Sequence, residues 1–146
     1  MDFEAYEKEC EKIQEENEKY LELFEAELVE KGLSERTIHT HLNNVDFYIN
    51  TFLLRCEPLQ IDEGCYRIDD FLGEFFIRKC MWSTPGNIKT TAVSIKKFYA
   101  CMAEKEIIDK MDYEILCDTI KDDIESWQEI CRQFNDPYEE NPFALF

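Results

Sequence analysis

Histidines are few in this sequence, and the spacing of its cysteines and acids does not bring them together for catalysis or metal binding. The chain has two histidines, at positions 39 and 41, and seven cysteines. Adjacent acids such as Asp69 and Asp70 would point in different directions from a helix, because residues three or four apart share a helical face. No glycine-rich phosphate loop, G-x-S-x-G or H-E-x-x-H motif occurs. The sequence therefore predicts a protein that is not an enzyme, with no catalytic residue, metal site or cofactor.

The cysteines are scattered along the chain, and most fall at apolar positions of helical patterns. Their number is odd, and no two have the short separation of a zinc-binding pair. We therefore expect free, mostly buried thiols in a reducing compartment. The acidic N-terminus, MDFEAYEKECEK, lacks the basic and then apolar order of a signal peptide, so the predicted location is the cytoplasm. The cysteines are Cys10, Cys56, Cys65, Cys80, Cys101, Cys117 and Cys131.

Charge is distributed unevenly along the chain, whose net charge is −17. Residues 1–31 hold twelve acids and four lysines, and residues 112–146 hold ten acids and two bases. Residues 32–111 hold eleven acids and ten bases. Two acidic ends therefore flank a nearly neutral middle.

The composition indicates a single helical domain over residues 1–146. Hydrophobic residues make up 45% of the chain, which is enough for one packed core, and no apolar stretch is long enough to span a membrane. Glycine and proline number only four each, fewer than the turns of a β-sandwich or barrel need. The predicted fold class is all-α.

The expected helices follow from apolar periodicity and from residues that begin or end helices. Ser34 and Thr84 are placed to cap two helices that share one apolar register, Pro85 suits a first turn, and Gly32 suits a left-handed C-terminal cap. We expect helices at 3–31, from Ser34 to near Arg55, at 67–81, from Thr84 to a link at 107–110, and at 112–133, with a loop at 57–66 and an extended tail at 135–146.

The first expected helix is long and acidic, and its early apolar residues have heptad-like spacing. Phe3, Tyr6, Cys10 and Ile13 are separated by three, four and three residues, and Asn17 takes the next equivalent position. This stripe, within residues 3–28, favours packing on the chain's own bundle. Self-association through the same stripe is the alternative.

Two stretches in the middle resemble the N-terminal SAM-like, core-binding domain of phage integrases and other tyrosine recombinases. GLSERTIHTHLNNVDFYINTFL is similar to the first half of that domain, and IDDFLGEFFIRKC followed by STPGNIKTTAVSIKKFYACMAEKEII is similar to the second half. The resemblance covers about residues 20–115 and is carried by helix caps and apolar spacing. It implies a compact bundle of four or five helices that clasps one side of a DNA duplex. A C-terminal helix at 116–134 and the tail follow that bundle.

In that family the second and fourth helices face the DNA major groove, so the resemblance implies a role in DNA integration or recombination. The family's His-x-x-Arg catalytic motif does not occur in these 146 residues, so the module is expected to be non-catalytic by itself. Arg and Lys can neutralise phosphates, and Asn and Thr can reach phosphates or base edges. The implied contacts are Arg36, Thr37, Thr40 and Asn44 on the second helix, with His39 and Asn43 on a neighbouring face, and Lys89, Thr90, Lys96 and Lys97 on the fourth.

The acidic ends support a different interpretation, in which the chain binds protein. An acidic helical adaptor, or an inhibitor that competes for a recombinase's basic surface, would use the same fold without DNA. The expected partners are thus double-stranded DNA, bound weakly by this module alone, or a recombinase-type protein.

Overall fold

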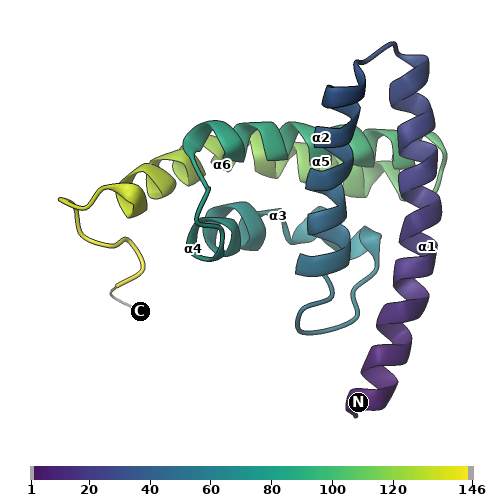
Figure 1. Cartoon of the computed structure of the whole chain (residues 1–146), viewed down its shortest axis with the longest axis horizontal. Coiled ribbons are helices and arrows are strands. Elements are labelled where there is room, and N and C mark those ends of the chain that lie inside the picture. The colour runs from purple at the N-terminus through teal and green to yellow at the C-terminus, as the bar shows by residue number, and fades with distance from the viewer. Residues whose placement is uncertain (1, 145–146) are drawn as a thin grey trace.

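The computed structural model describes residues 2–144, and all regular structure in that range is helical, which confirms the predicted fold class (Figure 1). α2 continues without a break into a π-helical segment, and a second such segment joins α3 to α4. The elements are α1 (Phe3–Glu30), α2 (Glu35–Asp46), a π-helical segment (Phe47–Phe52), a 3-10 helix (Ile61–Tyr66), α3 (Ile68–Asp70), a second π-helical segment (Phe71–Phe75), α4 (Phe76–Lys79), α5 (Pro85–Glu104) and α6 (Lys110–Asn135).

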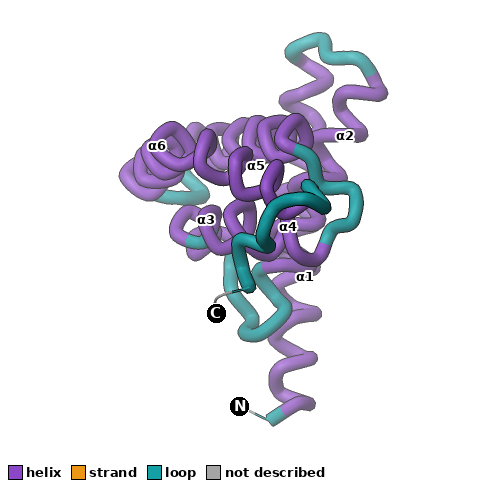
Figure 2. Tube along the Cα trace, turned by 90° about the vertical axis from the view of Figure 1, so that its left-hand side faces the viewer, coloured by secondary structure: helices purple, strands orange, loops and turns teal. Residues whose placement is uncertain are grey.

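The long helices form two antiparallel pairs that cross each other. α1 and α2 form one pair, and α5 and α6, which pack extensively on each other, form the second (Figure 1). α2 lies directly on α5, while α3 and α4 pack against α6. The N-terminal turns of α1 extend beyond the bundle (Figure 2). No helix in the described range is both long and apolar enough to cross a membrane.

The residues expected to begin and end helices do so. Ser34 Oγ accepts from the Thr37 N–H at 3.2 Å, and Thr84 Oγ1 accepts from the Asn87 N–H at 3.0 Å, with Pro85 in the first turn of α5. Gly32 has φ +79°, so it takes the left-handed conformation that follows the end of α1. These signals act over a few residues, which is why the sequence alone locates them.

An aromatic cluster occupies the core where the two π-helical segments meet. The Phe71 ring centroid lies 4.8 Å from that of Tyr48 and 4.9 Å from that of Phe52, and Phe52 packs edge-on against Phe75 at 5.1 Å. A π-helical turn contains one more residue than an α-helical turn. Such turns are rare, and they occur where packing or function requires a wider turn. Here the widened turns bring large rings from both segments into one cluster.

Several element boundaries differ from the sequence prediction. Residues 57–66 were expected to be a loop, but Ile61–Tyr66 forms a 3-10 helix that buries Ile61 and Cys65. The last helix begins at Lys110, two residues early, because the Asp109 side chain accepts from the Met111 N–H at 2.9 Å. The second helix ends at Phe52, short of Arg55.

The ends of the chain pack on the bundle to different extents. From α1, Ile13, Asn17, Phe24 and Leu28 are buried within the chain itself, while Phe3 is 72% exposed. Self-association through this stripe stays a prediction. The tail is not fully extended, because it contains turns at 137–139 and 142–144. Phe143 packs edge-on against Phe134 at 5.8 Å, and Leu145 and Phe146 lie outside the described residues.

Candidate nucleic-acid interface

The candidate interface is formed by α2 and α5, whose apolar faces are turned into the core. Ile38 and Val45 of α2 are buried, as are Ile88 and Ile95 of α5. These residues hold the equivalent positions of the register that the two helices share. The polar positions between them must therefore face outward or lie where the helices cross.

A buried polar contact joins α2 to α5 at their crossing. Ser94 Oγ lies 2.7 Å from His41 Nδ1 and accepts from Asn44 Nδ2 at 3.0 Å, and it donates to the Thr90 carbonyl at 3.1 Å. Because that carbonyl takes the single hydroxyl proton, we assign the His41 proton to Nδ1, which donates to Ser94. His41 and Ser94 were not among the predicted site residues. His41 lies three residues after Ile38 and four before Val45, a spacing that could have placed it on the buried face.

The environment of His41 opposes its charged form. Burial, and then the nearby Lys97 ammonium, lower the pKa of His41 below its ordinary value of 6.5. A histidine whose pKa is lower in the folded state binds fewer protons there than in the unfolded chain. The folded state is therefore destabilised as the pH falls from above 6.5 into the window between the two values.

We expect this effect to appear in the free energy of unfolding, measured with urea between pH 7.5 and pH 5.5 (roughly one unit either side of the ordinary histidine pKa). Relative to His41→Gln, the native chain should lose stability as the pH falls. His39→Gln is the matched control, because His39 is exposed on the same helix and makes no hydrogen bond among the described residues. If the native chain and His41→Gln lose stability in parallel as the pH falls, the pKa of His41 is not lowered in the folded state.

The predicted contact residues lie on the outer surface of the two helices. All ten are exposed except Asn44, which is half-buried and donates to Ser94. Thr40 Oγ1 donates to the Arg36 carbonyl at 3.0 Å, and Thr90 Oγ1 donates to the Gly86 carbonyl at 3.1 Å. These three side chains have already used a donor within the fold. Arg36, Thr37, His39, Asn43, Lys89, Lys96 and Lys97 keep their donors directed to the surface.

The cations of this surface lie in a locally positive part of an acidic molecule. α5 carries Lys89, Lys96 and Lys97 against a single acid, Glu104, in its last turn. None of these lysines, nor Arg36, belongs to an ion pair among the described residues. Four of the described ion pairs lie within one helix or turn, at spacings of three or four residues. The α5 lysines are therefore available to an anionic partner.

A hollow of about 420 Å³ beside these lysines is also lined by Lys31, a cation that the sequence analysis did not place near them. It lies between α1 and α5, and Lys31, Lys96 and Lys97 contribute to its lining. Lys31, whose side chain is exposed, also lies 3.9 Å from the half-buried Glu27 carboxylate, a long contact for an ion pair. Lys31 and Lys97 are far apart in the sequence, so no local pattern could have connected them.

The loop before α5 presents further residues that sequence analysis missed. Met81 is fully exposed and Trp82 is 63% exposed, next to Arg78 and Lys79 at the end of α4. An exposed tryptophan beside basic side chains can stack on a base or cover a sugar. The signal was the run RKCMW immediately before the cap of α5.

The buried thiols are poorly suited to nucleophilic chemistry. Cys65, Cys80, Cys101 and Cys131 are buried, as expected, but Cys56 is exposed. Burial raises the pKa of Cys65 to about 12 and is also the largest reason that the pKa of Cys101 is about 11, so both stay protonated at neutral pH. Within residues 2–144, no group of three or more His, Cys, Asp or Glu is placed to hold a metal ion.

Comparison with known proteins adds no relative. No protein-family model matches the sequence, no curated protein is significantly similar to it, and no solved structure resembles it at a significant level. Any functional assignment therefore depends on the side chains of this chain alone.

Proposed function

We propose that the chain is a DNA-binding module that contacts one side of a duplex through α2 and α5. The observation that carries this proposal is the positive surface of α5, whose three lysines form no ion pair with any described residue, in a chain of net charge −17. The resemblance of residues 20–115 to the SAM-like, core-binding domain of tyrosine recombinases adds a context, DNA integration or recombination. The module is non-catalytic by itself in this proposal.

The acidity of the whole chain does not prevent local binding, because salt screens distant charges. At physiological salt the Debye length is about 8 Å, so a phosphate on α5 interacts mainly with the cations around it. Arg36 and the three α5 lysines allow about four phosphate contacts, which is few for a specific complex. The expected affinity is that of a non-specific binder, with a Kd of about 1–100 μM at physiological salt. A partner domain or a second copy would be needed for tight binding.

Replacing Arg36, Lys89 and Lys97 together by alanine is expected to weaken this binding strongly. Each phosphate contact contributes about −0.9 to the slope of log K against log salt, so the triple variant should lose a slope of about 2.7. Fluorescence anisotropy with a labelled duplex, titrated at several salt concentrations, measures both the affinity and the slope.

The matched control removes three cations from another part of the molecule. Lys8, Lys12 and Lys19 are exposed on α1 among many acids, and their triple alanine variant changes the net charge by the same amount. It should bind DNA with nearly the native slope. Equal losses in both variants would mean that net charge alone governs the interaction, and the α2–α5 surface would then not be the site.

An acidic stripe along α6 favours a second candidate function, binding to a basic protein surface. Glu114, Asp118, Asp122 and Glu125 are exposed at spacings of four, four and three residues, so they share one face of the helix. An adaptor or inhibitor of a recombinase-type protein would use this stripe. A chain that does not bind duplex DNA, but binds a basic DNA-binding domain until Asp118 and Asp122 are changed to asparagine, would assign this alternative.

A further inference from the structure

The hollow of about 420 Å³ between α1 and α5 combines basic and apolar side chains on one open surface. Val93, Lys96 and Lys97 are exposed on α5 and are three or four residues apart, so they share one face of the helix. Lys31, at the C-terminal end of α1, and the half-buried Leu33 line the opposite side. We call this surface the lysine hollow. Its composition suits a segment that carries apolar and acidic side chains together.

The first turns of α1 have that complementary composition. They extend beyond the bundle, and the Phe3 side chain is exposed there (Figure 2). Residues 2–11, which we call the acidic end, hold five acids and one lysine. Phe3, Glu7 and Glu11 follow one another at four-residue spacing, so they lie on one side of the helix. Neither of these glutamates forms an ion pair with a described residue.

The acidic end cannot reach the lysine hollow of its own chain. Both belong to α1, which is one continuous helix from Phe3 to Glu30. At 1.5 Å per residue, Phe3 and Lys31 are separated by roughly 40 Å along the helix axis. A second molecule must therefore supply the acidic end that the hollow receives.

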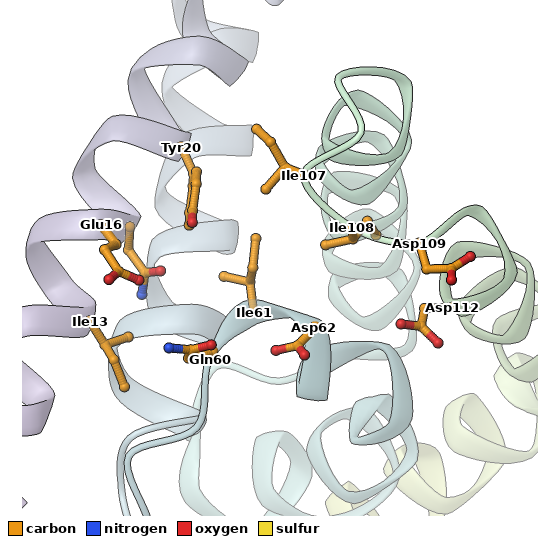
Figure 3. Close-up of a pocket in the computed structure, with 11 residues that line it drawn as sticks. Ile13, Glu16, Tyr20, Gln60, Ile61, Asp62, Ile107, Ile108, Asp109 and Asp112 are labelled. Atoms are coloured by element: carbon orange, nitrogen blue, oxygen red, sulfur yellow. The ribbon is translucent and has the colours of Figure 1, made fainter.

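Another cavity beside α1 has the opposite charge. It has a volume of about 290 Å³, and Figure 3 shows Glu16, Asp62, Asp109 and Asp112 around it. No lysine or arginine lines it. An acidic segment would be repelled from this cavity, so charge directs the segment to the lysine hollow instead.

We infer that two copies of this chain associate by placing the acidic end of one copy in the lysine hollow of the other. Phe3 would cover Val93, and Glu7 and Glu11 would pair with the α5 lysines. A two-fold arrangement lets each copy provide one acidic end and receive one, which closes the assembly as a dimer. Two of the lysines also belong to the proposed duplex surface, but the inference does not depend on DNA binding.

Sedimentation velocity of the full chain over a range of concentrations measures this association. Physiological salt is the suitable condition, because a Debye length of about 8 Å screens the repulsion between distant acids of the two copies. We expect a concentration-dependent dimer. Phe3→Ala should weaken it by about tenfold or more without any change of charge. Val29→Ala is the matched control, because Val29 is an exposed apolar residue of α1 that does not line the hollow.

An exchange of charges tests the pairing of the two surfaces directly. Glu7→Lys with Glu11→Lys gives an end that the native hollow repels, and Lys96→Glu with Lys97→Glu gives a hollow that repels the native end. Each double variant alone should therefore lose the dimer. Mixed in equal amounts, the two variants should form a mixed dimer, because each end then meets a hollow of opposite charge. Each exchange changes the net charge of −17 by four, so both variants stay strongly acidic and net attraction cannot produce the mixed dimer.

Several results would overturn the inference. A native chain that stays monomeric at every concentration would do so, as would equal losses in Phe3→Ala and Val29→Ala. Absence of a mixed dimer would show that these two surfaces do not pair. Glu15→Lys with Glu18→Lys makes the same change of charge at exposed positions in the middle of α1 and should dimerise at least as well as the native chain. Loss of the dimer in this control would mean that the acidic end has no special role.

Discussion

Replacing Trp127 by alanine is expected to lower the free energy of unfolding by about 3–5 kcal/mol, which is typical of a buried tryptophan. Trp127 is 1% exposed and connects α6 to the α3 region, where its indole N–H donates to Asp69 Oδ1 at 2.7 Å. A Cβ added at Gly73 would lie 2.9 Å from the indole ring, so the ring fills its space closely. Small domains have a total stability of about 5–15 kcal/mol, so the variant should be only marginally folded.

Urea unfolding measures this loss through the transition midpoint, with the slope m as a check that the unfolding is still cooperative. Trp82→Ala is the matched control, because Trp82 is 63% exposed and its truncation should cost less than about 0.5 kcal/mol. Similar losses in the two variants would mean that Trp127 does not anchor α6 to the rest of the bundle. Titrating the Trp82→Ala variant with duplex DNA also tests whether the exposed Trp82 takes part in DNA binding.

The parts of the fold that follow local rules could be predicted from the sequence. Ser34 and Thr84 each bond to a backbone N–H three residues later, and Gly32 adopts a positive φ, so the signal and its effect lie within one turn. The 3-10 helix at Ile61–Tyr66 was missed because distant tyrosines hold it. Tyr48 donates to the Gly64 carbonyl at 2.7 Å, and Tyr99 donates to the Ile61 carbonyl at 2.6 Å.

The residues of the candidate sites were likewise predictable only where local patterns determine their position. Exposure of Arg36 and the α5 lysines follows from helical periodicity, because they fall between apolar positions. His41 and Ser94 are in contact although they lie 53 positions apart in the sequence. This contact could not be predicted without knowing that α2 and α5 cross. The cavity of about 290 Å³ beside α1 draws residues from three separate stretches of the chain, and only the fold shows that Glu16 and Asp112 line one space. Charge sums along the chain indicated acidic ends and gave no sign of a cavity.

Replacing Gly64 by alanine is expected to destabilise the fold by about 2–4 kcal/mol, because a methyl group there has no space. Its Cβ would overlap the Tyr99 hydroxyl and lie 3.1 Å from a ring carbon of Tyr48. Neither ring can move aside easily, since both are fully buried and both hydroxyls hold the 3-10 helix. Moving Tyr99 would break its hydrogen bond to the Ile61 carbonyl.

The same substitution at Gly86 is expected to have the opposite sign, which makes it a sharp control for Gly64→Ala. Gly86 lies in the first turn of α5, where the nearest atom to an added Cβ is Thr84 Oγ1 at 3.8 Å. Alanine there meets no obstacle and favours the helix, so stability should be unchanged or rise by up to about 1 kcal/mol. Thermal and urea unfolding of the two variants side by side measure the difference. Equal effects would mean that the tyrosines do not confine position 64, and the 3-10 helix would then owe its conformation to something other than these two hydroxyl contacts.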